Sequence, residues 1–174
     1  MSAQSALVLL LCFPLAAQTV LRVGPGGFAQ IRDAILAAAP NDVIEVAAGI
    51  YAPFTLDKAL TITAAQGALV SVLPTFPGSH TFLRPPAGAT ARIVGLQFRN
   101  PWPFLLAAET LVDRGTVWLQ DCVCESPASN YLAGLQVSNA TVVLERCILA
   151  GFARAWAARA HRFLCRRPWL VSRD

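Results

Sequence analysis

Asp121 and Arg146 are the charged residues whose spacing most suggests a site. They occupy the same position in two similar segments, GTVWLQDCVCES (115–126) and ATVVLERCILAG (140–151), which share a constant offset of 25 in sequence number. If the two segments stack, the carboxylate and the guanidinium lie side by side and could contact a bound polysaccharide or act as an acid–base pair. An ion pair that only stabilises a solvated sheet face is the alternative, and it is the usual role of opposite charges on neighbouring strands.

Trp118 is the aromatic residue best placed to bind a ligand in the same segment. If Val117 and Leu119 point inward, Trp118 points outward, at the position that Val143 holds in the second segment. Beside the loop that carries Trp102, an exposed Trp118 would offer an aromatic face to the apolar side of a sugar ring. Packing of Trp118 beneath that loop is the alternative.

Other polar residues form no catalytic or metal-binding motif. The two histidines, His80 and His161, lie in different segments, and no C-x-x-C pair is present. No pair of aspartates falls on matching positions of the two segments, as an acid–base pair of a hydrolase would require. We therefore predict no catalytic residue, no metal ligand and no cofactor, and expect no depolymerising activity.

The cysteines admit either disulfides or a core of free thiols. Four remain if Cys12 is removed with a signal peptide, and four cysteines in an exported chain allow three pairings. Cys122 and Cys147 take the same position in the two similar segments, where stacked thiols fill a core without bonding. The spacing favours the free-thiol arrangement.

Repetition at this period is typical of stacked architectures. A unit of this length is too short for a pair of helices, and its apolar positions fall in β-branched runs. A weaker third copy, RIVGLQFRN (92–100), aligns Ile93 with Leu119 and Leu96 with Cys122. We predict an all-β fold, a parallel β-solenoid of roughly four or five coils at this period.

One helix is expected near the N-terminus, over residues 28–39. Phe28, Ile31, Ile35 and Ala38 form one apolar stripe at helical spacing, and Pro40 ends it. Short strands are expected at 20–23, 43–46, 54–56, 60–63 and 70–73. A helix laid across the first coil would cover strand edges that otherwise recruit other chains.

Residues 23–64 resemble the N-terminal segment of the pectin-lyase-like right-handed parallel β-helix superfamily. The resemblance rests on Ile31, Ala34, Ile35, Ala38, Asp42, Ile44, Val46, Gly49, Tyr51, Lys58 and Leu60. Asn41, Ala48 and Ile50 depart from it, but they alter turns and not the core. The resemblance implies a right-handed β-helix with an N-terminal capping helix. It implies no single activity, because the superfamily includes lyases, esterases, hydrolases and proteins without known catalysis; Ca²⁺ is expected only under a lyase alternative.

The chain divides into three parts in this interpretation. Residues 1–17 carry an apolar run of signal-peptide length, too short to span a bilayer, and 18–152 form the β-helix domain. Residues 153–174 are an Arg-rich tail, either a capping helix or a terminus foreign to the coil series. Up to Phe152 eight basic and nine acidic residues give −1, whereas six arginines and one aspartate after it give +5.

Two proline-rich connectors, 73–89 and 100–109, are expected to protrude between coils. Proline lacks the N–H that an interior strand donates to its neighbour. Loops that protrude from a rigid scaffold often carry binding residues.

These features favour a secreted, periplasmic or cell-surface protein that binds an acidic or neutral polysaccharide or acts as a scaffold. The candidate ligand-binding residues are Trp118, Trp102, Asp121 and Arg146. A polysaccharide lyase or glycoside hydrolase, or a degenerate fragment of one, is the first alternative, and a structural or adhesive repeat without a small ligand is the second. Nucleic acid is not an expected partner, because the basic charge is confined to the tail. The oligomeric state stays open.

Overall fold

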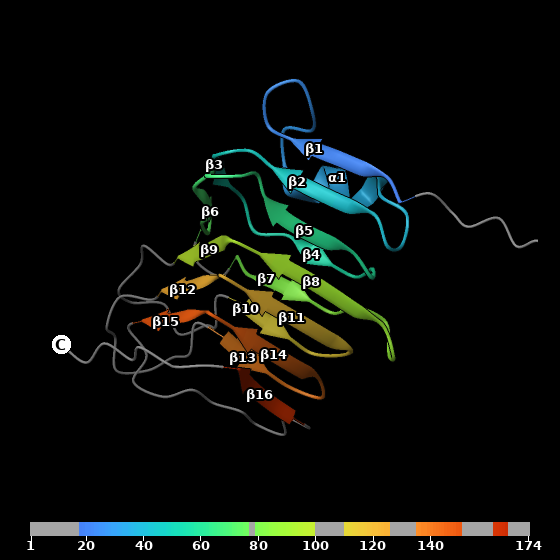
Figure 1. Ribbon diagram of the computed structural model, residues 1–174, viewed down its shortest axis with the longest axis vertical. Helices are drawn as coiled ribbons and strands as arrows, with labels where there is room; N and C mark the ends of the chain where they lie inside the picture. Colours follow the sequence, from blue (N-terminus) through green and yellow to red (C-terminus); the bar gives the residue numbers. More distant parts are fainter. Residues whose placement is uncertain (1–17, 77–78, 100–109, 126–134, 151–161, 167–174) are drawn as a thin grey trace, which may run out of the picture.

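The computed structural model of the chain describes residues 18–76, 79–99, 110–125, 135–150 and 162–166. Their backbone winds as a parallel β-solenoid of about four turns, with β1 at one end and β16 at the other (Figure 1). The all-β, parallel fold predicted from the repeat is confirmed.

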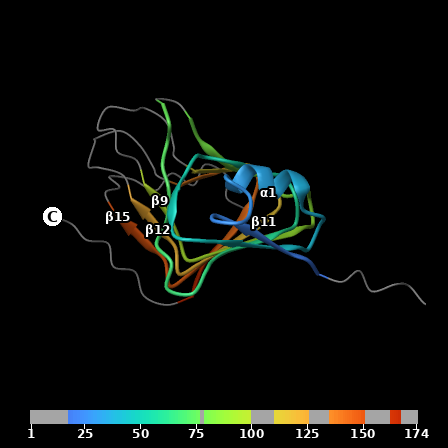
Figure 2. The ribbon, with the colours of Figure 1, turned by 90° about the horizontal axis from the view of Figure 1, so that it is seen from above.

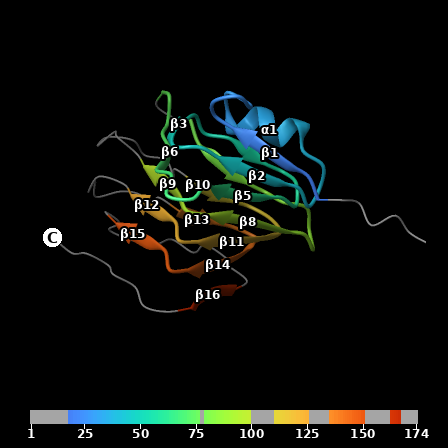
Figure 3. The same cartoon turned by 45° about the horizontal axis from the view of Figure 1, so that its top comes forward.

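Three parallel sheets form the walls of the solenoid. The seven-stranded sheet contains β1 (Val20–Val23), β2 (Val43–Val46), β5 (Thr61–Ala64), β8 (Thr90–Val94), β11 (Thr116–Gln120), β14 (Thr141–Glu145) and β16 (Arg162–Arg166). The five-stranded sheet contains β3 (Gly49–Tyr51), β6 (Val70–Val72), β9 (Leu96–Arg99), β12 (Val123–Glu125) and β15 (Ile148–Ala150). The four-stranded sheet contains β4 (Thr55–Leu56), β7 (Thr81–Leu83), β10 (Thr110–Val112) and β13 (Leu135–Val137). Successive strands of the seven-stranded and five-stranded sheets lie one below the other (Figure 3).

Strand register confirms the predicted repeat. Thr116 pairs with Thr141 and Leu119 with Leu144, which reproduces the offset between the two similar segments. Ile93 pairs with Leu119, so the third copy is also aligned as predicted. Equivalent positions of successive coils are therefore direct neighbours.

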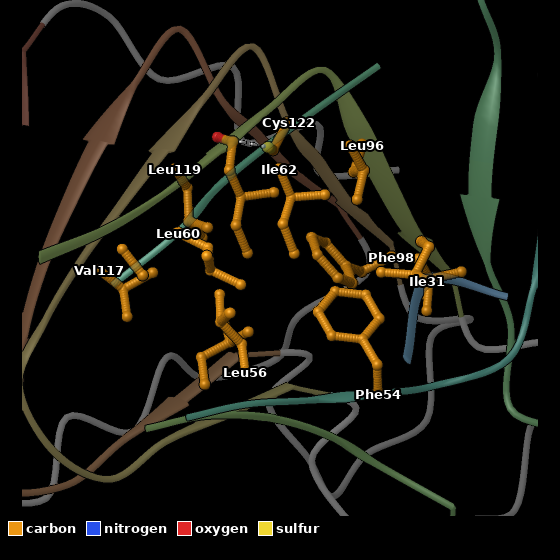
Figure 4. Packing of buried hydrophobic residues seen from close by; sticks show 14 of the residues in the cluster. Ile31, Phe54, Leu56, Leu60, Ile62, Leu96, Phe98, Val117, Leu119 and Cys122 are labelled. Carbon is orange, nitrogen blue, oxygen red and sulfur yellow. Dashed lines mark hydrogen bonds between the residues drawn. The ribbon is translucent and has the colours of Figure 1, made fainter. Parts of the chain in front are cut away.

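Aliphatic side chains stack through the interior of the solenoid. On the inner side of the seven-stranded sheet, each member of one column pairs with the next, and all are at most 3% exposed: Ile44, Ile62, Ile93, Leu119 and Leu144. The rings of Phe54 and Phe98 pack together opposite this column, 6.5 Å between centroids (Figure 4). Each coil buries its apolar face only against its neighbours, as in other stacked arrays.

The single helix of the described residues, α1 (Ile31–Ala37), lies across the first coil (Figure 2). Three residues of the predicted stripe, Ile31, Ile35 and Ala38, are buried, whereas Phe28 lies before the helix. The helix begins later than predicted because the Phe28 N–H donates to the Arg22 carbonyl and Phe28 bridges Val23. Residues 28–30 thus belong to the preceding turn.

Lys58 fixes the C-terminal end of α1. Its ammonium donates to the carbonyl oxygens of Ile35 (2.8 Å), Leu36 (3.1 Å) and Ala38 (2.8 Å). A helix leaves its last carbonyls without intrahelical donors, and a cation there also complements the helix dipole. Lys58, a residue on which the resemblance rests, therefore has a structural role.

Lys58→Met should lower the free energy of unfolding by about 1–3 kcal/mol, because three carbonyls lose a charged donor. The measurement is urea unfolding followed by circular dichroism. Arg32→Met is the matched control, since Arg32 is exposed and pairs only with the adjacent Asp33 among the described contacts. Equal midpoints for the two variants would contradict the capping role.

The first proline-rich connector contains a strand, so its prediction as a wholly protruding loop is wrong. β7 pairs with β4 on one side and β10 on the other and is interior to the four-stranded sheet. Its three residues, Thr81–Leu83, contain no proline, and the prolines at 85 and 86 follow the strand. The strand β3, at Gly49–Tyr51, was also not among the strands predicted from the sequence.

Part of the Arg-rich tail is also a strand. β16 pairs in parallel with β14, from Thr141 opposite Arg162 to Glu145 opposite Arg166. The capping helix, one of the two alternatives for the tail, is therefore not what residues 162–166 form. The rest of the tail, the signal segment 1–17 and Trp102 lie outside the described residues, and their predictions stay predictions.

Candidate functional site

The outward face of β11 and β14 carries the residues that the sequence singled out. Exposure alternates along β11: Val117 and Leu119 are fully buried, whereas Trp118 and Gln120 are half-buried on the opposite side. Trp118 pairs with Val143 in the next coil, as predicted. The sheet therefore places Trp118 on its outer surface.

Trp118 is stacked against a cation from the preceding coil. Arg92 pairs with Trp118 in the register, and its guanidinium carbon lies 5.3 Å from the centroid of the indole ring. A guanidinium over an aromatic face is attracted by the ring quadrupole and holds the ring in place. The indole N–H is buried without a hydrogen-bond partner among the described residues. Arg92 was not singled out from the sequence.

Asp121 and Arg146 sit at equivalent corners between the seven-stranded and five-stranded sheets. Both have left-handed backbone conformations, φ 53° for Asp121 and 51° for Arg146, as does Gly95 (φ 75°) one coil earlier. The turn at each corner aims the side chain outward, next to the end of the strand. Non-glycine residues adopt this conformation at a cost of about 1–2 kcal/mol. Because both corners adopt it, the two polar side chains leave the backbone at equivalent positions and meet.

A row of polar residues crosses three coils from Arg92 to Glu145. Arg92 donates to Gln120, the residue that precedes Asp121. Arg146 then donates to both carboxylate oxygens of Asp121, from Nε at 2.6 Å and from Nη2 at 2.7 Å, and from Nη1 to Glu145. We call Arg92, Trp118, Gln120, Asp121, Glu145 and Arg146 the outer strip.

The ion pair sets the protonation states of this strip. The hydrogen bonds that Arg146 donates to Asp121 lower the pKa of Asp121. The same hydrogen bonds raise the pKa of Arg146 well above its usual range. Asp121 is thus a fixed anion that accepts hydrogen bonds, and it is unsuited to act as a general acid near neutral pH. The predicted pairing of Asp121 with Arg146 is confirmed, and its geometry is that of a charge-balanced pair.

Among the described residues, no group of three or more His, Cys, Asp or Glu side chains is placed to hold a metal ion. No helix within the described ranges is both long and apolar enough to cross a membrane.

A pocket of about 320 Å³ lies under α1, on the outer side of the four-stranded sheet. Its walls are Arg32, Ile35, Leu36, Pro53, Phe54, Thr55, Asp57, His80 and Phe82. His80 meets Phe82 edge-on, with 6.2 Å between centroids, and its Nδ1 is buried without a partner among the described residues. This size falls at the lower end of the range of small-molecule sites, about 300–1,000 Å³.

Sequence reasoning did not find this pocket. The three elements that meet there are α1, β4 and β7, and β7 lay in a segment predicted to be a loop. His80, the residue before that strand, was the available signal, but an isolated histidine does not indicate which elements surround it. The pocket depends on the pairing of β7 with β4, which no local pattern showed.

No protein-family model, curated protein or solved structure matches this chain. The parallel β-solenoid is therefore established by its own strand pairing, and function must be argued from its surfaces.

Proposed function

We propose that this chain is a polysaccharide-binding scaffold module of the pectin-lyase-like β-helix type that acts outside the cytoplasm, at the cell surface or in secreted form. The observation that carries the proposal is the outward-facing Trp118, stacked on Arg92 and bordered by the other polar residues of the outer strip. Export is inferred from the apolar run at 5–17.

The outer strip combines the two features that a sugar ring requires. An indole surface accepts the apolar C–H face of a pyranose, and planar charged or amide groups hydrogen-bond its hydroxyls. Coils of a solenoid repeat about every 4.8 Å, so the polar groups of neighbouring coils form a row along which an extended chain can lie. Side chains that rigid strands already hold in place lose little conformational freedom when a ligand binds.

The pocket under α1 is a second location for the same class of ligand. Phe82 and Leu36 supply apolar surface, and Asp57 and His80 supply polar groups. Its volume would suit the end of a chain or a small sugar, whereas the outer strip suits the middle of a chain. Substitutions at the two locations should therefore have different effects on polysaccharide binding.

Trp118→Ala should abolish retardation of the protein in affinity electrophoresis through gels that contain polysaccharide, because the stacking surface is removed. The panel is pectin, polygalacturonate, alginate and a neutral glucan. Phe76→Ala is the matched control, since Phe76 is an aromatic residue that is 61% exposed and belongs to none of the strands that carry the strip. Retardation lost only on His80→Ala would assign binding to the pocket instead.

The alternatives differ in measurable ways. A lyase or hydrolase would release unsaturated or reducing ends from the same polymers, with Ca²⁺ dependence for a lyase, and Asp121→Ala would abolish turnover. If neither turnover nor retardation is observed, the structural or adhesive repeat is the remaining alternative. Retardation without turnover supports the proposal.

A further inference from the structure

Cys122 and Cys147 hold the same position in two adjacent coils. Each follows a left-handed corner residue, and the Ile148 N–H donates to the Cys122 carbonyl at 2.9 Å. The next residues along, Val123 and Ile148, are direct register partners. Adjacent parallel strands lie about 4.8 Å apart, within the span of about 4.4–6.8 Å between Cα atoms that a disulfide bridges.

The two thiols differ in accessibility. Cys122 is fully buried, and its sulfur lies 3.5 Å from the Ile93 carbonyl, the dashed contact in Figure 4, and 3.3 Å from that of Gln120. Cys147 is only half-buried, with its sulfur 3.3 Å from the Leu119 carbonyl. Both are free thiols in this structure. Cys147 can therefore react with an oxidant from solvent, whereas Cys122 is shielded from it.

Among the described residues, this is the only pair of thiols that shares a position. Cys124 pairs with Phe98 on one side and Leu149 on the other. Cys165 pairs with Leu144. Neither has a sulfur as its register partner, so the aligned thiols of the described residues are Cys122 and Cys147.

We propose that Cys122 and Cys147 form an oxidisable dithiol, which closes to a disulfide between adjacent coils when the protein meets a small disulfide oxidant such as oxidised glutathione. The bond would join the two corners that carry Asp121 and Arg146. It would thus lock the coil spacing of the outer strip.

The chemistry runs from the accessible sulfur inward. The Cys147 thiolate attacks one sulfur of oxidised glutathione, which forms a mixed disulfide and expels one glutathione thiolate. Cys122 then loses its proton and attacks the Cys147 sulfur, which expels the second glutathione. The two cysteine sulfurs are oxidised, one glutathione disulfide is reduced to two thiols, and two protons leave the protein.

The pKa values of the two thiols favour the same order of attack, with Cys147 first and Cys122 second. A hydrogen bond from Cys122 lowers the pKa of Cys147 to about 7. The same contact, together with burial, raises the pKa of Cys122 well above its usual value. Burial raises the pKa of Cys124 to about 12, which keeps that thiol inert.

Tryptic mapping of the full chain tests the proposal. Trypsin separates Cys147, in peptide 147–154, from Cys122 and Cys124, in peptide 115–146. After treatment with oxidised glutathione, the two peptides should appear joined, at their summed mass less two hydrogens. The oxidised protein should also unfold at a higher urea concentration than the reduced one, because the bond constrains the unfolded chain.

Two serine variants define the outcomes. Cys147→Ser, at a half-buried position, should lose the joined peptide, and Cys124→Ser should keep it. Retention of free Cys147 after oxidation, a glutathione adduct on Cys147 that never resolves, or joining of Cys147 to the peptide with Cys165 would each overturn the proposal. Circular dichroism of both variants checks that they remain folded.

Discussion

Ile93→Ala is expected to lower the free energy of unfolding by about 2–5 kcal/mol, the usual cost of truncating a buried aliphatic side chain. Ile93 is fully buried in the middle of the inner column, between Ile62 and Leu119. Coils of a solenoid contact only their neighbours, so a cavity at this level weakens the coupling between the two ends of the stack.

Chemical denaturation followed by intrinsic fluorescence and circular dichroism provides the measurement. Leu36→Ala is the control, because Leu36 is an aliphatic residue that is 77% exposed on α1. Surface substitutions of this kind change stability by about 0.5 kcal/mol or less. A loss at Ile93 no larger than that at Leu36 would mean that the inner column does not hold the coils together.

The seven-stranded sheet was predictable because its positions repeat. Its strands β11 and β14 carry the pattern that defines the repeat offset, and period-2 alternation fixes which residues point inward. A shift by one residue would turn Leu119 and Leu144 to solvent, so burial selects one register. The sequence therefore predicted both the fold class and the outward position of Trp118.

The four-stranded sheet was less predictable because its strands are very short. β4 lies within the strand predicted at 54–56, but β7 has three residues, too few for alternation to be recognised, and prolines follow it at 85 and 86. Such strands form because neighbouring coils supply their partners, which is a tertiary effect on a weak local preference. The pocket under α1 was missed for the same reason.

At the outer strip, the sequence indicated the ion pair but not its neighbours. Matching positions placed Asp121 beside Arg146, and the two hydrogen bonds between them confirm it. Arg92 belongs to the weaker third copy. It pairs with Trp118 at a sequence offset one residue longer than the offset between the two similar segments. Its contact with the indole ring depends on side-chain conformation, which spacing does not reveal.

Gly115→Ala is expected to destabilise the protein by about 2–5 kcal/mol, from a conformational cost and an overpacking cost that add. Gly115 has φ 68°, where a residue with a Cβ pays about 1–2 kcal/mol. A Cβ there would also lie 2.5 Å from the Pro85 carbonyl oxygen and 2.9 Å from that of Pro86, both in the preceding coil. Those atoms are backbone, so relief requires the coils to separate, and overpacking of this kind costs about 1–3 kcal/mol more.

Gly88→Ala separates the two costs, because Gly88 has φ 77° but no atom within 4 Å of the added Cβ. That variant should lose only the conformational part, about 1–2 kcal/mol. Urea unfolding of both variants gives the difference, which reports the contact between Gly115 and the turn at residues 85 and 86. Equal losses would show that this contact is loose, and that the close spacing of the coils on this side of the solenoid tolerates a methyl group.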